Sequence, residues 1–261
     1  MYKVLKNKLL ICPLICTMAL FAQAHGQIIV AGAADLNAAL TEIAASYQKQ
    51  TGQTVKLSFG SSGNLFTQIE NGAPFDVFFS ADMDYPKKLI DDGFANGPSL
   101  YRYAVGRLVL WVPASSALDL EHRGMDVLLD PSVKKIAIAN PQHAPYGRAA
   151  VAALRHFELY EKLADRLVLG ENVSQAAQFV ESGNAQAGIV ALSHARAPAM
   201  KGKGRYWEIP ADAYPTLDQG MVVLAHSQNK KEAAAFLDYL RTAGAAAIMQ
   251  RYGFSLAEER H

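Results

Sequence analysis

Short apolar runs alternate along the chain with stretches in which apolar residues recur every three or four positions. The first run, residues 27–31 (QIIVA), is almost entirely apolar, which is typical of a strand buried in a parallel sheet. In the next stretch, 35–50, Leu36 and Leu40 fall on one face of a helix. Gly52 then supplies the residue that commonly ends a helix. This order predicts a strand followed by a helix that covers it.

The same alternation continues to the C-terminal end. Repeated strand–helix units are typical of the α/β class, with largely parallel sheets and right-handed crossovers. No internal repeat or long linker interrupts the pattern. Further strands are predicted at 54–58, 76–80, 108–112, 136–139, 167–169, 187–191 and 221–225, and further helices at 64–70, 147–157 and 173–182, around Pro86 and at the C-terminal end.

The first 24 residues have the pattern of a secretion signal. Lys3, Lys6 and Lys8 precede an apolar stretch over 9–21 that is short for a membrane span. Residues 22–24 (AQA) match the small-residue cleavage site of a signal peptide. We therefore expect residues 1–24 to be removed on export, with an uncleaved membrane anchor as the alternative.

The composition of the exported chain argues against several classes of function. Both cysteines, Cys12 and Cys16, lie in the predicted signal, so we expect neither disulfides nor thiol chemistry. Removing the three lysines of the signal from the 25 basic residues leaves 22 against 24 acidic ones, a net charge of −2. No run of one sign indicates a nucleic-acid partner or a membrane patch. The length of 261 residues, 51% of them hydrophobic, allows two compact units.

Four predicted strand-to-helix corners, 33–35, 60–63, 141–147 and 171–173, contain small or polar residues. In parallel sheets, ligands bind beyond the carboxyl ends of the strands. The first amides of a helix lack intrahelical partners, and each helix start is equivalent to roughly +0.5 charge. Four starts aimed at one point would supply up to about +2, which matches a tetrahedral dianion without any Lys or Arg. Taken singly, each corner also fits an ordinary helix-entry turn.

Six segments in order along the chain carry a resemblance to a known family: 60–65 (GSSGNL), 72–82 (GAPFDVFFSAD), 106–112 (GRLVLWV), 137–147 (AIANPQHAPYG), 171–176 (ENVSQA) and 188–191 (GIVA). Through them, nearly the whole exported chain resembles the periplasmic molybdate-binding proteins of ABC importers. The resemblance implies a type II periplasmic-binding-protein fold with two lobes, each a mostly parallel sheet flanked by helices. The ligand, molybdate or tungstate, would bind in the cleft between the lobes without any cofactor.

The resemblance also implies how the chain divides into domains and how these domains move when the ligand binds. We expect lobe I to comprise 25–106 and 219–261, and lobe II to comprise 107–218, with chain crossings near 103–108 and 217–221. The lobes would close on the ligand like a hinge, and the membrane permease of the importer would recognise the closed form. The protein is then expected to be a periplasmic monomer with no catalytic step, no nucleic-acid partner and no membrane insertion once the signal is removed.

Family ligand contacts can be carried over onto matching positions of this chain. They come from hydroxyls and main-chain amides rather than from basic side chains. Two positions fall in each lobe, so the anion would bridge the cleft. The predicted contacts are Asp35, Ser62, Tyr146 and Val173, with Ala34 and Ser61 as further candidates.

The chain departs from the family pattern at two places. Asp35 stands where some members have Ser, and a carboxylate facing a dianion is repulsive. We expect this side chain to turn away and cap its own helix by accepting the amide of Asn37 or Ala38, which leaves its own N–H as the donor. Ala191 stands where some members have Tyr, and we expect Tyr146 to supply the missing hydroxyl.

Three other functions fit single features of the sequence: a serine hydrolase, a protein that binds another oxyanion and a protein that binds a metal cation. A serine hydrolase would use Ser62 with His143 or His194, but the G-x-S-x-G motif and an identifiable His–Asp partner are missing. A protein that binds another oxyanion such as sulfate would use the same corners. A protein that binds a metal cation would use their oxygen and nitrogen donors, Asp35, His143, Tyr146 and Glu171.

Overall fold

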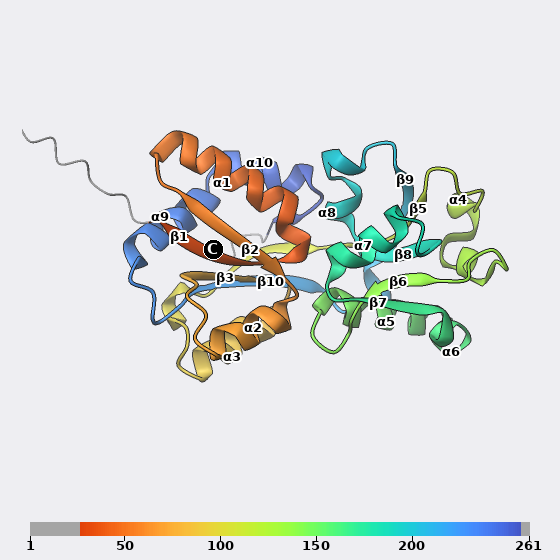
Figure 1. Cartoon of the computed structure of the whole chain (residues 1–261), viewed down its shortest axis with the longest axis horizontal. Coiled ribbons are helices and arrows are strands. Elements are labelled where there is room, and N and C mark those ends of the chain that lie inside the picture. The colour runs from red at the N-terminus through yellow and green to blue at the C-terminus, as the bar shows by residue number, and fades with distance from the viewer. Residues whose placement is uncertain (1–26, 257–261) are drawn as a thin grey trace, which may run out of the picture.

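A computed structural model of the chain describes residues 27–256. The predicted signal peptide, residues 1–24, lies outside this range. Two halves lie side by side along the long axis of the molecule, each built on one sheet (Figure 1). We call the half with the six-stranded sheet lobe I and the half with the five-stranded sheet lobe II. Between residues 27 and 256, no helix has the length and apolar character that a membrane crossing requires.

The sheet of lobe I has the strand order β11-β4-β10-β3-β1-β2. Its strand β1 pairs in parallel with β2 and β3, so the chain leaves these three strands at the same edge of the sheet. The other three pairings are antiparallel. The strands are β1 (Ile28–Ala33), β2 (Val55–Gly60), β3 (Val77–Ser80), β4 (Tyr101–Gly106), β10 (Leu217–Val223) and β11 (Ser255–Leu256).

Helices cover both faces of this sheet, with α1, α9 and α10 on one side and α2 and α3 on the other (Figure 1). The predicted end of α1 is confirmed, because Gly52 adopts φ +75° and its N–H bonds to the carbonyl of Gln48. The helices are α1 (Asn37–Thr51), α2 (Ser62–Glu70), α3 (Asp84–Asp91), α9 (Lys230–Leu240) and α10 (Ala243–Arg251), with short 3-10 turns η1 (Ala34–Leu36) and η2 (Gly97–Ser99).

The sheet of lobe II has the strand order β7-β6-β8-β5-β9, in which β6 is parallel to β7 and β8. The strands are β5 (Leu108–Pro113), β6 (Ile136–Ala139), β7 (Leu167–Gly170), β8 (Ala187–Ala191) and β9 (Gly204–Glu208). The helices are α4 (Leu120–Arg123), α5 (Pro145–His156), α6 (Tyr160–Leu163), α7 (Val173–Glu181) and α8 (Leu192–Ala195), with 3-10 turns η3 (Gly124–Leu129), η4 (Ala164–Arg166), η5 (Pro198–Met200) and η6 (Ala211–Ala213).

The predicted parallel pairing is confirmed between β1 and its neighbours β2 and β3, and between β6 and its neighbours β7 and β8. These strands include all four that lead into the corners, β1, β2, β6 and β7. Strands β4, β5, β9, β10 and β11 pair antiparallel instead. They carry the chain between the sheets or form a sheet edge, and antiparallel pairing does not require the crossover connection that parallel strands need.

The chain passes from one sheet to the other through β-structure. Arg107 alone separates β4 in lobe I from β5 in lobe II, and the chain returns through β10. Two close strand connections form a stiffer link than a flexible tether would. The lobe limits 25–106 with 219–261, and 107–218, remain a prediction.

A buried carboxylate ties the two ends of lobe I together. Asp76, just ahead of β3, accepts the amide of Ile29 at 2.8 Å and the hydroxyl of Ser227 at 2.6 Å. The side-chain amide of Asn229 adds a contact at 3.2 Å. Because Ser227 and Asn229 lead into α9, this one side chain holds the C-terminal helices against β1.

We expect Asp76→Ala to lower the free energy of unfolding by about 2–3 kcal/mol, because it leaves several buried donors without an acceptor. Urea denaturation followed by circular dichroism measures this difference. Asp238→Ala is the matched control, since Asp238 is 75% exposed and pairs with Arg241 on the same helix. Its loss should cost less than about 0.5 kcal/mol. Equal effects of the two substitutions would contradict the structural role of Asp76.

Candidate functional site

The four predicted corners meet in one small pocket between the lobes. Its volume is about 200 Å³. None of the residues that line it, all within the described chain, is Lys or Arg. Each corner contributes two or three lining residues, among them Ala34 and Asp35, Ser61 and Ser62, Pro145 and Tyr146, and Asn172 and Val173. All four predicted contact residues therefore line this pocket, two from each lobe. The two further candidates, Ala34 and Ser61, line it as well.

The first corner joins β1 to η1. Asp35 is the middle residue of η1. The prediction that its carboxylate caps its own helix is wrong, because neither η1 nor α1 has a side-chain cap. One carboxylate oxygen, Oδ2, instead accepts a 2.6 Å hydrogen bond from Nε2 of Gln219. The other, Oδ1, has no hydrogen-bond partner within residues 27–256. Burial raises the pKa of Asp35 to about 6, and hydrogen bonds from Gln219 and Tyr146 offset only part of this effect.

Gln219 joins the first corner to the other lobe. Its Nε2 also lies 3.3 Å from the hydroxyl of Tyr146, and its Oε1 accepts the hydroxyl of Tyr103 at 2.7 Å. Burial and the charge of Asp35 raise the pKa of Tyr146 well above its usual value, so this hydroxyl keeps its proton. Sequence reasoning missed Gln219. The only feature that points to this residue is that its side-chain amide lies within 217–221, where the chain was predicted to cross between the lobes.

The second corner joins β2 to α2 and presents two hydroxyls. Ser61 is the N-cap of α2, and its Oγ accepts the amide of Asn64 at 3.3 Å. The capping residue explains why α2 begins at Ser62, two residues before the predicted start. The Oγ of Ser62 accepts the amide of Ala81 at 2.9 Å, so its hydroxyl proton is left to point elsewhere.

The third and fourth corners bring two helices of lobe II to the same pocket. Pro145 takes the first position of α5, where its missing N–H costs nothing. Asn172 caps α7 by accepting the amide of Gln175 at 3.0 Å. Tyr146 and Val173 therefore lie in the first turns of α5 and α7, where main-chain amides have no intrahelical acceptor.

Several hydrogen bonds cross between the lobes beside α2 and hold the pocket shut. The amide of Gly63 donates to the carbonyl of His143 at 2.9 Å, and Nδ1 of His143 lies 2.8 Å from Oγ of Ser61. Asn64 bonds across the cleft to Glu171. The ion pair Arg148–Asp82, at 2.6 Å, adds a further crossing, and the side chains that line the pocket are nearly all buried as a result.

A second set of crossings closes the cleft beside η1. The hydroxyl of Ser174 donates to the carbonyl of Ala34 at 3.1 Å, and that of Ser193 to the carbonyl of Asp35 at 2.7 Å. Nε2 of His194 lies 2.6 Å from Oγ of Ser174. Burial lowers the pKa of His194 to about 4, so the ring is neutral at ordinary pH. Sequence reasoning did not predict these contacts, because they join residues more than 100 positions apart or lie in a short helix.

A profile of the family described as bacterial extracellular solute-binding protein matches residues 28–255. The chain belongs to this family. The molybdate-binding protein ModA of Rhodobacter capsulatus is 39% identical over 231 residues, which cover 88% of this chain and 89% of that protein. ModA of Azotobacter vinelandii is 39% identical over 239 residues, 92% of this chain and 93% of that protein.

One solved structure agrees with the family assignment, and a second shares the fold. The periplasmic molybdate-binding protein of Azotobacter vinelandii superimposes with a TM-score of 0.84 at 39% identity, covering 88% of this chain and 100% of that one. The sulfate-binding protein SubI of Mycobacterium tuberculosis reaches a TM-score of 0.73 at 16% identity, covering 90% of this chain and 88% of that one. The predicted two-lobed binding-protein fold is confirmed by the first of these similarities.

The alternative functions find little support in the geometry of this solute-binding protein. His143 bonds to Ser61 and His194 to Ser174, so neither histidine contacts Ser62 as a hydrolase would require. Within residues 27–256, no group of three or more His, Cys, Asp and Glu side chains is arranged to hold a metal ion. His143 and Glu171 lie beside the pocket, where they pair at 3.9 Å.

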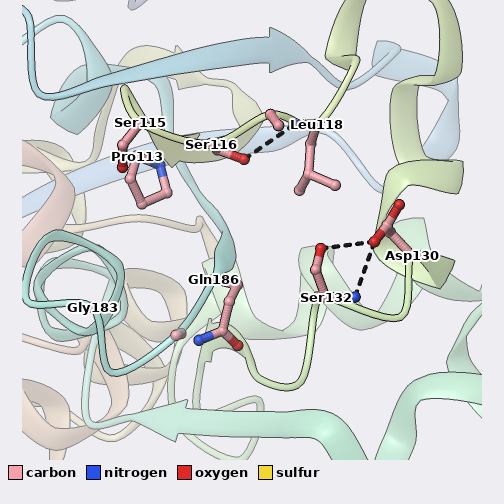
Figure 2. A pocket seen from close by; sticks show the side chains of 10 residues that line it. Pro113, Ser115, Ser116, Leu118, Asp130, Ser132, Gly183 and Gln186 are labelled. Carbon is pink, nitrogen blue, oxygen red and sulfur yellow. Dashed lines mark hydrogen bonds between the residues drawn. The ribbon is translucent and has the colours of Figure 1, made fainter.

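A wider depression of about 860 Å³ lies in lobe II of the solute-binding protein, away from the four corners. Figure 2 shows it between the segments that carry Ser116, Asp130 and Gln186. Several of its polar groups already have partners: Ser132 donates to Asp130 through both its amide and its hydroxyl, and Gln186 accepts the amide of Lys135. The smaller pocket between the lobes is therefore the candidate site.

We expect Gly63→Ala to prevent full closure of the solute-binding protein. A Cβ atom there would lie 2.7 Å from the carbonyl oxygen of His143 and 2.5 Å from the hydroxyl of Tyr85. Because the His143 carbonyl belongs to the opposite lobe, the overlap opposes closure. Small-angle X-ray scattering, with and without added oxyanions, should give a larger radius of gyration than for wild type.

Gly244→Ala is the matched control for this prediction. Gly244 lies exposed in α10, and its Cβ would meet no atom closer than 4.0 Å. The control should scatter like wild type under both conditions. A Gly63→Ala protein that also scatters like wild type throughout would contradict the closure argument.

Proposed function

We propose that this solute-binding protein captures molybdate, or the closely similar tungstate, in the cleft between its lobes and delivers it to the permease of an ABC importer. The observation that carries the proposal is the meeting of four strand-to-helix corners at one buried pocket that no Lys or Arg lines. The similarity to the molybdate-binding proteins of Rhodobacter capsulatus and Azotobacter vinelandii, at 39% identity, supports the choice of anion.

Main-chain amides supply the charge that the anion needs. The starts of α2, α5 and α7, together with η1, would contribute up to about +2 if all pointed at the ligand. The residues that line the pocket are nearly all buried, and an environment with little water strengthens each of these interactions. We assign the amide contacts to Asp35, Ser62, Tyr146 and Val173, with Ala34 and Ser61 as weaker candidates.

Two hydroxyl groups add donors to the amides. The Oγ of Ser62 accepts the Ala81 amide, so its own proton is free to reach an oxygen of the anion. The hydroxyl of Tyr146 accepts from Gln219, and its single proton, which otherwise interacts with Asp35, turns to the anion. In this chain Tyr146 thereby takes the place of a hydroxyl that Ala191, a fully buried alanine, does not carry.

The anion shifts the protein toward its closed state. Its contacts come from both lobes, so it binds the closed form more tightly than the open one. The permease then distinguishes loaded from empty protein by the shape of the closed lobes. The protein works as a periplasmic monomer and binds and releases its cargo unchanged, with no catalytic step and no cofactor.

We expect molybdate and tungstate to stabilise the mature protein, and sulfate, phosphate and divalent metal ions to do so far less. A ligand at 100 times its Kd adds about 2.7 kcal/mol to the free energy of unfolding, which is readily seen as a rise in Tm. A thermal-shift panel of these ions measures the effect. Stabilisation by a metal cation, with none by molybdate, would overturn the proposal. Stabilisation by sulfate alone would show that the bound anion is sulfate and not molybdate.

We expect Ser62→Ala to weaken molybdate binding by about 10- to 100-fold, because a hydrogen bond to a charged group contributes about 1.5–3 kcal/mol. Isothermal titration calorimetry gives the Kd, and thermal unfolding without ligand reports the separate loss of the bond to Ala81. Ser132→Ala is the control, since that hydroxyl lies in the wider depression of lobe II. Unchanged affinity in Ser62→Ala would remove Ser62 from the site.

A further inference from the structure

One carboxyl group lines the pocket proposed to take a dianion. Asp35 is only 2% exposed, and it belongs to the residues that enclose the cavity. Its Oδ2 accepts the Gln219 amide, whereas Oδ1 has no hydrogen-bond partner within residues 27–256. A buried polar atom without a partner is costly, and a buried charge without one is more costly still. Binding of a proton to Oδ1, a hydrogen bond from a donor, or a nearby cation would remove this cost.

The surrounding elements supply no cation. The titratable groups around Asp35 are Tyr146 on α5, Tyr103 on β4 and His194 on α8, and burial keeps all three uncharged near neutral pH. The charged groups farther out are already paired. They are Asp82 with Arg148, beyond β3, and Glu181 with Lys203, at the end of α7.

We propose that Asp35 acts as a carboxylic acid in the loaded protein: its Oδ1 carries a proton and donates it to an oxygen of the bound oxyanion. This inference rests on the proposed function. The proton comes from solution, so capture takes up one dianion and one proton together. Asp35 is then a specificity-determining residue, because a pocket of donors alone favours a fully deprotonated oxyanion over one that carries its own hydrogen.

The direction of the proton linkage follows from burial. In the closed protein, burial already raises the pKa of Asp35 to about 6. A dianion beside the carboxyl raises this pKa further, because like charges disfavour ionisation. In the open protein, water reaches the cleft and the pKa falls toward its usual value. Between these two pKa values binding takes up a proton, so affinity falls as the pH rises, by at most about tenfold per pH unit.

Calorimetry on the wild-type protein tests the proposal directly. Molybdate is titrated between pH 6.5 and 8.5, where it stays a dianion, in pairs of buffers with different ionisation enthalpies. The dependence of the measured heat on the buffer should give uptake of close to one proton at the lower end of this range, with Kd rising toward the upper end. Molybdate binding with no proton uptake and a constant Kd overturns this inference alone. No molybdate binding at any pH overturns the proposed function as well.

Asp35→Asn provides a neutral side chain of the same shape that keeps a donor at this place. It should bind molybdate without proton uptake, with a Kd that hardly changes with pH, and more tightly than wild type at pH 8.5. His194→Gln, which alters the other buried titratable group at the lobe boundary, should keep the wild-type pH dependence. Thermal unfolding confirms that both variants fold.

Two results with these variants would refute the acid form of Asp35. One is a folded Asp35→Asn protein that no longer binds molybdate, because the site would then require the charged carboxylate. The other is phosphate binding by wild type that Asp35→Asn abolishes, because an ionised Asp35 would be accepting the hydrogen of hydrogen phosphate.

Discussion

Amides at the start of a helix need acceptors from outside the helix, and in this protein the starts of four helical segments line one cavity. Two of these starts belong to each lobe, so only a guest that lies between the lobes can reach all four. Every other feature of the site follows from this constraint. The corners carry small or capping residues, the cavity is small, and the lining contains no basic side chain. A tetrahedral guest with an acceptor on each vertex meets the requirement, whereas a cation does not.

Closure of the two lobes uses mostly main-chain groups and short side chains. The carbonyls of Ala34, Asp35 and His143 each accept a bond from the opposite lobe. Such groups have little freedom to adjust, so they form together or not at all. The cleft therefore closes in a single defined geometry, and this geometry fixes the distances between the four helix starts.

The fold was predictable wherever the signal is local. Strands β6 and β8 agree residue for residue with the apolar runs, because each is buried on both faces. The corners were found by their small and capping residues, and all four lie at the pocket. Strands β4 and β9 were missed: β9 is a largely polar edge strand, and its pairing depends on distant chain. The direction of the Asp35 side chain was also missed, because its partner Gln219 lies 184 positions away.

Gln219 connects the strands that link the two lobes to the carboxyl group of the pocket, because it donates a hydrogen bond to Asp35. It lies in β10, next to an irregularity in the pairing with β4, and these are the strands through which the chain passes between the lobes. Its partners Asp35 and Tyr103 belong to lobe I, whereas Tyr146 belongs to lobe II. In the proposed cycle, opening of the lobes would take Tyr146 away from Gln219, while Asp35 would keep its bond to the Gln219 amide. Water would then reach the carboxyl from one side only, so that hydration of this single group would accompany unloading and return Asp35 to its ionisation in the empty protein.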